Sequence, residues 1–255
     1  EFEEGKGRLE FKDVYFKYHE SSNWVLEDIS FSVNPGETLA IIGSTGSGKS
    51  SLINLIPRFY DAVKGNITID NIDVKDISLN DLRDKIAIVP QKVLLFTGSI
   101  SENIKWGSEK ASVGEVEKVA KIAKAHDFIL SFNDGYDTYL GQGGVNLSGG
   151  QKQRISIARA LIKRPNILIL DDSTSAVDLI TERSIRGKLK EYLKETTTVL
   201  IAQRITSVMD AEKILVLDRG KIVGQGSHEE LMETCDVYKD IYHSQLGKEG
   251  VDFGS

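Results

Sequence analysis

The feature that most constrains the fold of this chain is the octapeptide GSTGSGKS at residues 43–50. The apolar run LAII at residues 39–42 precedes it and predicts a buried strand. The run KSSLINLI, which begins at Lys49, follows it and predicts a helix that Pro57 ends. A G-x-x-x-x-G-K-[ST] pattern between a strand and a helix is typical of a phosphate-binding loop. The chain is therefore expected to contain an α/β nucleotide-binding core.

The residue types of this loop each have a chemical reason. Glycines let backbone N–H groups approach the phosphates at a helix N-terminus, where the helix dipole favours negative charge. The Lys49 ammonium is expected to reach the β- and γ-phosphates, and the Ser50 hydroxyl to bind Mg²⁺. The alternative, a flexible Gly/Ser turn, is disfavoured because strand, lysine, serine and helix are all in place. The predicted nucleotide-binding residues of this segment are Gly43, Ser44, Thr45, Gly46, Ser47, Gly48, Lys49, Ser50 and Ser51.

Two adjacent carboxylates, Asp171 and Asp172, end the apolar run ILIL at residues 167–170. With a phosphate-binding loop upstream, Asp171 is expected to act as a Walker B acid, which holds Mg²⁺ beside the phosphates. The alternative is an acidic strand end that only caps the helix after it.

Strand and helix patterns alternate along the chain, which predicts a mostly parallel sheet covered by helices. Alternating apolar residues in RLEFKDVYFKY, residues 8–18, predict a further strand near the N-terminus. Between Gln91 and Arg154 the pattern becomes helical, with a capping box at residues 112–115, and this stretch is expected to form a smaller inserted lobe. A hairpin is predicted through residues 218–220.

Composition narrows the classes of function. The net charge of −6 disfavours a general nucleic-acid binder, and the single cysteine, Cys235, excludes an internal disulfide and indicates a reducing compartment. No apolar stretch approaches the roughly 20 residues that a membrane-spanning helix needs. The sequence begins with EFEEGKGRLE and lacks an initiator Met, so we expect an excised part of a longer protein whose remaining part holds the membrane anchor.

The segment NLSGGQKQR, residues 146–154, resembles the signature motif of the ATP-binding-cassette (ABC) transporter family. IVPQ, which ends at Gln91, resembles the Q-loop of this family, and STSAVD, which ends at Asp178, resembles its D-loop. Tyr18 matches the aromatic residue that stacks on adenine, although alone it is equally consistent with a half-buried strand tyrosine. Over nearly its whole length the chain is similar to the nucleotide-binding domain of exporters.

The resemblance implies an α/β fold, namely the ABC ATPase fold. This fold has a P-loop NTPase core with a mostly parallel sheet, an N-terminal antiparallel β subdomain and an inserted helical subdomain. Residues 1–91 and 155–245 are expected to form the ATP-binding core with its β subdomain, and residues 92–154 the helical subdomain with the signature motif. Residues 246–255 are expected to form a disordered tail.

The resemblance also implies the cofactors ATP and Mg²⁺, with Ser50, Gln91 and Asp171 as the metal ligands. Gln91 therefore belongs to the nucleotide site as well.

In the family, the signature motif acts in trans. The Ser148 hydroxyl and the amides that follow it sit at a helix start and form a second anion site. This site closes over ATP bound by a second, similar domain, while the partner's signature closes over ATP bound here. The implied partners are that second ABC nucleotide-binding domain and the transmembrane domains of a transporter, at the cytoplasmic face of the cell (inner) membrane. The residues concerned are Ser148, Gly149, Gly150 and Gln151.

Two positions depart from the family pattern, and they are the candidate catalytic residues. Asp172 stands where hydrolytic members have a glutamate that polarises the attacking water. Its side chain is one methylene shorter, and a misplacement of about 1 Å can lower a rate roughly 10²-fold. Gln203 stands where the family has a histidine that contacts the γ-phosphate. Glutamine donates an amide hydrogen bond, but it carries no charge and shuttles no proton.

Both departures, with Lys49, Ser50 and Asp171 intact, predict a site that binds Mg-ATP well and hydrolyses it slowly. That combination resembles the degenerate-site half of a heterodimeric exporter of the bacterial multidrug type. The alternative is a fully competent ATPase domain of a homodimeric exporter, with Asp172 as the base. A soluble ABC protein that acts on DNA or ribosomes is disfavoured by the acidic charge and by the lack of room for a long coiled coil before Ser148. The cargo stays open between drug, lipid and peptide, with drug favoured by family analogy.

Overall fold

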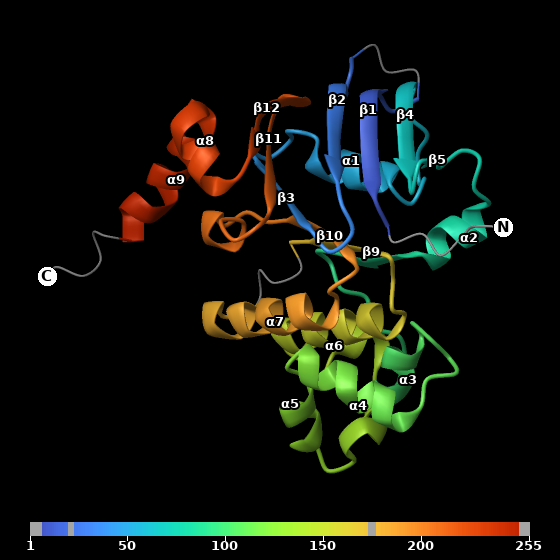
Figure 1. The fold of residues 1–255 in the computed structure, drawn as a ribbon. Helices are drawn as coiled ribbons and strands as arrows, with labels where there is room; N and C mark the ends of the chain where they lie inside the picture. The colour runs from blue at the N-terminus through green and yellow to red at the C-terminus, as the bar shows by residue number, and fades with distance from the viewer. Residues whose placement is uncertain (1–6, 20–22, 173–176, 250–255) are drawn as a thin grey trace, which may run out of the picture. The chain divides into compact units, whose positions relative to one another are not determined.

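The computed structural model describes residues 7–19, 23–172 and 177–249 (Figure 1). Within these ranges the chain forms two compact units. The first unit runs to Ile86 and resumes at Glu195, and the second unit is Ala87–Lys194. Residues 92–154, expected to form the helical subdomain, lie within the second unit.

Four strands of the first unit form an antiparallel sheet in the order β2-β1-β4-β5. Phe11 of the first strand stacks on Phe31 of the second, with 4.6 Å between the ring centroids. Leu9, Phe11 and Val14 are buried, so the predicted alternation places one face of the strand against the core. These strands confirm the expected N-terminal antiparallel β subdomain. They are β1 (Leu9–Phe16), β2 (Leu26–Val33), β4 (Lys64–Ile69) and β5 (Ile72–Asp73).

The second sheet of the first unit contains the strand that leads into the phosphate-binding loop. Its strands in this unit are β3 (Thr38–Gly43), β10 (Thr197–Ile201), β11 (Lys213–Asp218) and β12 (Lys221–Gly226). β3 pairs in parallel with both β10 and β11, and β12 returns antiparallel through the predicted hairpin. The apolar run of β3 is almost fully buried, as is usual for an inner strand of a parallel sheet that is covered on both faces.

Helices complete the first unit. α1 (Lys49–Leu55) follows the phosphate-binding loop and ends before Pro57, as the sequence predicts. The sequence patterns described above do not predict α2, α8 or α9, although Ser78 and Ser227 at the starts of α2 and α8 are standard N-cap residues. The remaining helices are α2 (Leu79–Asp84), the 3₁₀ helix η3 (Ile205–Ser207), α8 (His228–Thr234) and α9 (Asp236–Glu249).

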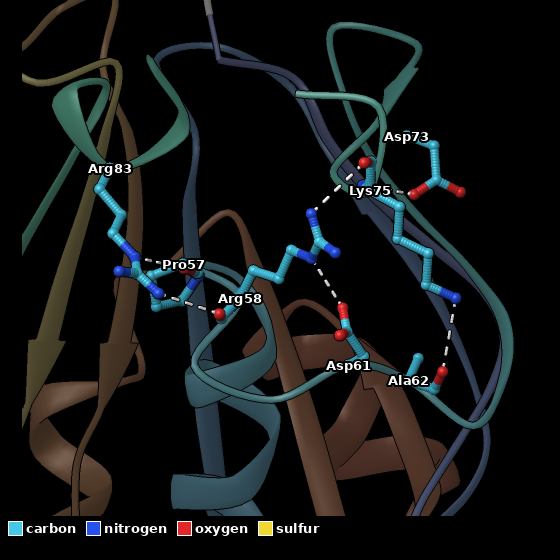
Figure 2. A network of polar contacts seen from close by, with 7 residues as sticks. All are labelled: Pro57, Arg58, Asp61, Ala62, Asp73, Lys75 and Arg83. Atoms are coloured by element: carbon cyan, nitrogen blue, oxygen red, sulfur yellow. Dashed lines mark hydrogen bonds and ion pairs between the residues drawn. The ribbon is translucent and has the colours of Figure 1, made fainter. Parts of the chain in front are cut away.

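A polar network fixes the loop that follows α1 (Figure 2). Arg58 has a φ of 54°, and its guanidinium bonds the Asp61 carboxylate at 2.7 Å and the Lys75 carbonyl at 3.3 Å. From α2, Arg83 donates to the carbonyl oxygens of Pro57 and Arg58, each at 3.2 Å. The loop is therefore held by side chains at both of its ends.

Helices dominate the second unit, where α6 contacts α3 and α4, and α7 contacts α4. The predicted capping box is confirmed: Ser112 Oγ accepts the Glu115 N–H at 3.3 Å at the start of α4. Val116, Val119 and Ala120 of this helix are buried, as its apolar period predicts. The helices are α3 (Ile100–Lys105), α4 (Val113–Ile122), α5 (His126–Leu130), α6 (Gly149–Ile162), α7 (Leu179–Tyr192), η1 (Gly135–Asp137) and η2 (Gln142–Gly144). The strands are β6 (Ile86–Val89), β7 (Gly98–Ser99), β8 (Tyr139–Leu140) and β9 (Ile167–Asp171).

Candidate nucleotide-binding site

The phosphate-binding loop leaves β3 in a conformation that requires glycine. A Cβ atom at Gly43 would lie 2.1 Å from the carbonyl oxygen of Leu217, far inside van der Waals contact. Gly48 has a φ of 105°, which residues with a side chain rarely adopt. The Gly220 N–H donates to the Ser47 carbonyl at 3.0 Å and so ties the loop to the turn between β11 and β12. The glycines of the motif are therefore required by the loop's own backbone geometry.

Lys49 lies folded back against this loop. Its Nζ donates to the carbonyl oxygens of Gly43 and Ser44, both at 2.8 Å, and lies 3.5 Å from Ser47 Oγ. These contacts join the Lys49 ammonium to oxygen atoms of the loop itself. No side chain among the described residues caps the first turn of α1. The backbone N–H groups of this turn point out of the helix N-terminus, toward the phosphate-binding loop. The loop is thus arranged to hold phosphate.

Tyr18 places an aromatic ring beside α1. Its hydroxyl hydrogen-bonds with Ser51 Oγ at 2.9 Å, and its ring is 36% exposed. Phe16 and Tyr60 approach the ring edge-on, with centroids 4.8 Å and 5.1 Å away. The sequence analysis did not single out Tyr60, although the aromatic pair in RFYD after α1 was the available signal. The predicted adenine-stacking residue is therefore partly open to solvent next to the phosphate-binding helix.

In the second unit, the Q-loop glutamine and the second acid of the doublet come together. Gln91 Nε2 donates to Asp172 Oδ2 at 3.1 Å. Asp172 is only 8% exposed and has a φ of 45°, a left-handed conformation that Asp adopts more readily than most residues. Asp171 ends β9 and is half-buried. The Asp172 carboxylate, which the sequence predicts at the position of the catalytic base, is thus buried and hydrogen-bonded within its own unit.

The side chains predicted to bind Mg²⁺ have suitable chemistry. Ser50 offers a hydroxyl, Asp171 a carboxylate and Gln91 a carbonyl, and hard oxygen donors are what Mg²⁺ prefers. Because Gln91 gives its amide N–H to Asp172, its carbonyl oxygen is the atom that remains for a metal. Among the described residues, no group of three or more His, Cys, Asp and Glu side chains is placed to hold a metal ion.

Gln203 follows β10 in the first unit, and its side chain is exposed. Its backbone carbonyl accepts a hydrogen bond from Gln245 Nε2 at 2.8 Å. The side-chain amide at this position can donate to a phosphate oxygen, but it holds no titratable proton.

The signature motif forms the start of α6. Ser148 Oγ accepts the Gln151 N–H at 3.2 Å, and Gln151 Oε1 accepts the Ser148 N–H at 2.9 Å, which makes a capping box. Ser148 and Gly149 are exposed, so the positive end of this 14-residue helix faces solvent. The hydroxyl of Ser148 uses a lone pair for the cap and keeps its own proton to donate to an anion.

Asp178, the last residue of the predicted D-loop, caps α7. Its carboxylate accepts the Thr181 N–H at 2.9 Å, and this bond holds the pKa of Asp178 below its usual value. Residues 173–176, the first four of the D-loop, lie outside the described residues.

Comparison with known proteins decides the family. The family model described as ABC transporter matches residues 26–175, a span that includes the phosphate-binding loop, the signature motif and the acid doublet. The chain belongs to the ABC transporter family. It is an ATP-binding domain of this family, which is an ATPase domain.

Relatives and solved structures agree with this assignment. The chain is 53% identical over 244 residues to the "uncharacterized ABC transporter ATP-binding protein YfiB" of Bacillus subtilis, covering 96% of this chain and 42% of YfiB. It is 46% identical over 241 residues to the ATP-dependent lipid A-core flippase of Saccharophagus degradans, covering 94% and 41%. The structure of a bacterial Atm1-family ABC exporter with ATP bound matches with a TM-score of 0.90 and 40% identity, over 94% of this chain and 42% of that one. This likeness confirms the expected ABC ATPase fold.

The chain thus spans less than half the length of these relatives. In the part of the chain that the structure describes, no helix is long and apolar enough to cross a membrane.

Proposed function

We propose that this ABC ATPase domain binds Mg-ATP firmly, hydrolyses it slowly, and completes with its signature motif the faster site of a second, non-identical domain. Two sets of observations support the two halves of this proposal. The phosphate-binding loop and Lys49 are arranged for phosphate, and the capped start of α6 is open to a second anion. By contrast, we place Asp172 and Gln203 at the positions of the catalytic base and of the histidine that contacts the γ-phosphate.

The observation that carries the proposal is the hydrogen bond between Gln91 and Asp172. A general base must come within about 2.6–3.2 Å of the proton that it removes. The Asp172 side chain is short and mostly buried, and one of its oxygens already accepts the Gln91 amide. Gln203 has no titratable proton with which to compensate. ATP bound at this site then mainly stabilises the dimer of the two nucleotide-binding domains. Hydrolysis at the partner's site allows the two domains to dissociate.

The setting of this activity is part of the proposal. We assign the domain to an exporter, at the cytoplasmic face of the cell membrane and attached through transmembrane domains, with no nucleic-acid partner. The likeness to the ATP-bound Atm1-family exporter supports an exporter. The 44% identity to the "putative multidrug export ATP-binding/permease protein YgaD" of Bacillus subtilis points to a drug as the cargo, and the 46% identity to the lipid A-core flippase points to a lipid, so the proposal covers both classes.

A single-turnover experiment with the chain alone tests the slow site. The chain is held in excess over labelled Mg-ATP, and bound nucleotide and released phosphate are followed together. We expect most of the ATP to be bound and to stay intact, while Lys49→Ala, which removes the ammonium from the loop, abolishes binding. Rapid phosphate release by the wild-type chain would support instead a competent ATPase domain that pairs with a second copy of itself.

A further inference from the structure

The C-terminal helix α9 contacts the loop that carries Gln203. Gln245 Nε2 donates to the Gln203 carbonyl at 2.8 Å, and Gln245 Oε1 accepts the Ile205 N–H at 2.7 Å. One side-chain amide therefore bonds the backbone on both sides of Arg204, from about 40 residues further along the chain. Both of its hydrogen-bonding ends are used on this single loop.

The face of α9 that carries Gln245 is anchored to the rest of the first unit. Tyr238 and Tyr242 precede Gln245 by seven and three positions, so the three side chains share one helix face. Tyr238 is fully buried, and its hydroxyl bonds His228 Nδ1 at 2.9 Å. The Tyr242 ring centroid lies 5.6 Å from the same imidazole. Burial raises the pKa of Tyr238 to about 12, so its hydroxyl keeps its proton across the physiological pH range. Gln245 thus extends from a helix face that is packed against the rest of the first unit.

The loop held by these two hydrogen bonds of Gln245, called the Gln245 clamp, is the turn between β10 and η3. Ile205 is fully buried, whereas the side chains of Gln203 and Arg204 are exposed. A backbone N–H next to a buried side chain needs a hydrogen-bond acceptor, and Gln245 Oε1 supplies it. The position of the Gln203 backbone, and with it the reach of the Gln203 side chain, depends on this contact.

We propose that Gln245 is a positioning residue, which holds the Gln203–Ile205 backbone so that the Gln203 amide meets the γ-phosphate of ATP. This inference rests on the proposed function, in which Gln203 takes the position of the histidine that contacts that phosphate. ADP lacks the γ-phosphate, so the clamp strengthens the binding of ATP and leaves the binding of ADP unchanged. Through one side chain, the C-terminal helix takes part in the discrimination between the two nucleotides.

The test measures the Kd of Mg-ATP and of Mg-ADP by calorimetry for the wild type, for three variants of the contact and for one control variant. Gln245→Met replaces both hydrogen bonds by an apolar chain of similar length. Gln203→Ala removes the proposed phosphate contact itself, and the third variant combines the two changes. Ser244→Ala, on the neighbouring exposed position, is the matched control.

We expect Gln245→Met to weaken ATP binding about three- to tenfold, the effect of a lost hydrogen bond, without changing ADP binding. Gln203→Ala should give a similar loss, and the double variant should lose no more than Gln203→Ala alone, because the two residues act through one contact. Ser244→Ala should match the wild type. A purely structural role of Gln245 predicts instead equal losses for ATP and ADP, and additive losses in the double variant.

Hydrogen exchange of the Ile205 amide shows whether the clamp forms in solution. Exchange should be faster in Gln245→Met than in the wild type, while Gln245→Glu, which keeps an acceptor for this N–H, should stay close to the wild type. If Gln203→Ala weakens ATP binding but Gln245→Met does not, the positioning role is wrong and the proposed function stands. If Gln203→Ala has no effect on ATP binding, the γ-phosphate contact of the proposed function is itself wrong.

Discussion

The side-chain amide of Gln91 donates a hydrogen bond to the carboxylate of Asp172, which lies 81 residues further along the chain. The same glutamine is predicted to ligate Mg²⁺ through its carbonyl oxygen. In the proposed site, one side chain therefore connects the predicted metal ligands to the predicted catalytic base. Loss of the Gln91 side chain should lower both the stability of the nucleotide-free domain and its affinity for Mg-ATP.

Replacement of Gln91 by leucine tests this link. The variant leaves the buried Asp172 carboxylate without the Gln91 donor, and hydrogen bonds to charged groups contribute about 1.5–3 kcal/mol. We expect the free energy of unfolding in urea to fall by about that amount and the affinity for Mg-ATP to fall with it. Asp172→Ala and the double variant complete the cycle, and strictly additive losses would show that the two side chains do not interact in solution.

Restoring the family's residues at both departing positions should raise the rate of ATP hydrolysis. Asp172→Glu lengthens the carboxylate by one methylene, and Gln203→His introduces an imidazole that carries charge and a transferable proton. Because a misplacement of about 1 Å costs roughly 10²-fold, we expect single-turnover phosphate release by the double variant to exceed that of the wild type by about this factor. Lys49→Ala in the same background is the control and should abolish the gain. A double variant as slow as the wild type would mean that these two residues do not limit the rate.

The signature serine has two roles that substitution can separate. Ser148→Ala removes both the phosphate-binding hydroxyl and the N-cap of α6, and should destabilise the fold by about 1 kcal/mol. Ser148→Asp keeps an N-cap acceptor but presents a negative charge to the partner's ATP. We expect Ser148→Asp to unfold like the wild type in urea and to stop hydrolysis at the partner's site, with ATP binding to this chain unchanged. A loss of ATP binding to this chain itself would reverse the assignment of the two sites.

The parts of this molecule that the sequence predicts are those where short-range patterns suffice. The phosphate-binding loop is a contiguous motif between a strand and a helix, and the capping box at Ser112 is readable because both partners lie within one turn. The alternation of apolar residues likewise identifies β1, since burial of one face enforces it. The hairpin is identified by the apolar run of β11 and the turn residues that follow it.

What the sequence did not predict depends on contacts between distant segments. The role of Gln245 appears only when α9 brings its amide to a loop about 40 residues away, and glutamine on a helix is otherwise an ordinary surface residue. The hydrogen bond between Gln91 and Asp172 is a tertiary contact of the same kind. Tyr60 joins Tyr18 because Arg58 and Arg83 fix the loop after α1, a polar network with no local signature (Figure 2).

The N-cap of α7 predicts a dependence of stability on pH. The Thr181 N–H lowers the pKa of Asp178 below its usual value of 3.8, so the ionised carboxylate stabilises the fold above that pH. The contribution is lost as the pH falls through the lowered pKa. Asp178→Asn keeps a neutral cap at every pH. We expect the wild type to exceed this variant in unfolding free energy at about pH 6, and the difference to shrink toward about pH 3. A difference that stays constant over this range would show that ionisation of Asp178 does not stabilise α7.

Tyr18 is predicted to bind the base of the nucleotide through its ring rather than through its hydroxyl. Tyr18→Ala removes the ring, and stacking of a base on an aromatic side chain contributes about 1–3 kcal/mol, so the affinity for Mg-ATP should fall by about 30-fold for the middle of that range, about 2 kcal/mol. Tyr18→Phe keeps the ring and loses only the bond to Ser51 Oγ, and should stay within about threefold of the wild type. Inorganic tripolyphosphate, which has no base, separates the two effects, since its binding should be equal in all three proteins. If Tyr18→Ala weakens tripolyphosphate binding as much as ATP binding, the tyrosine acts by supporting α1 and the phosphate-binding loop, and the base must be held elsewhere.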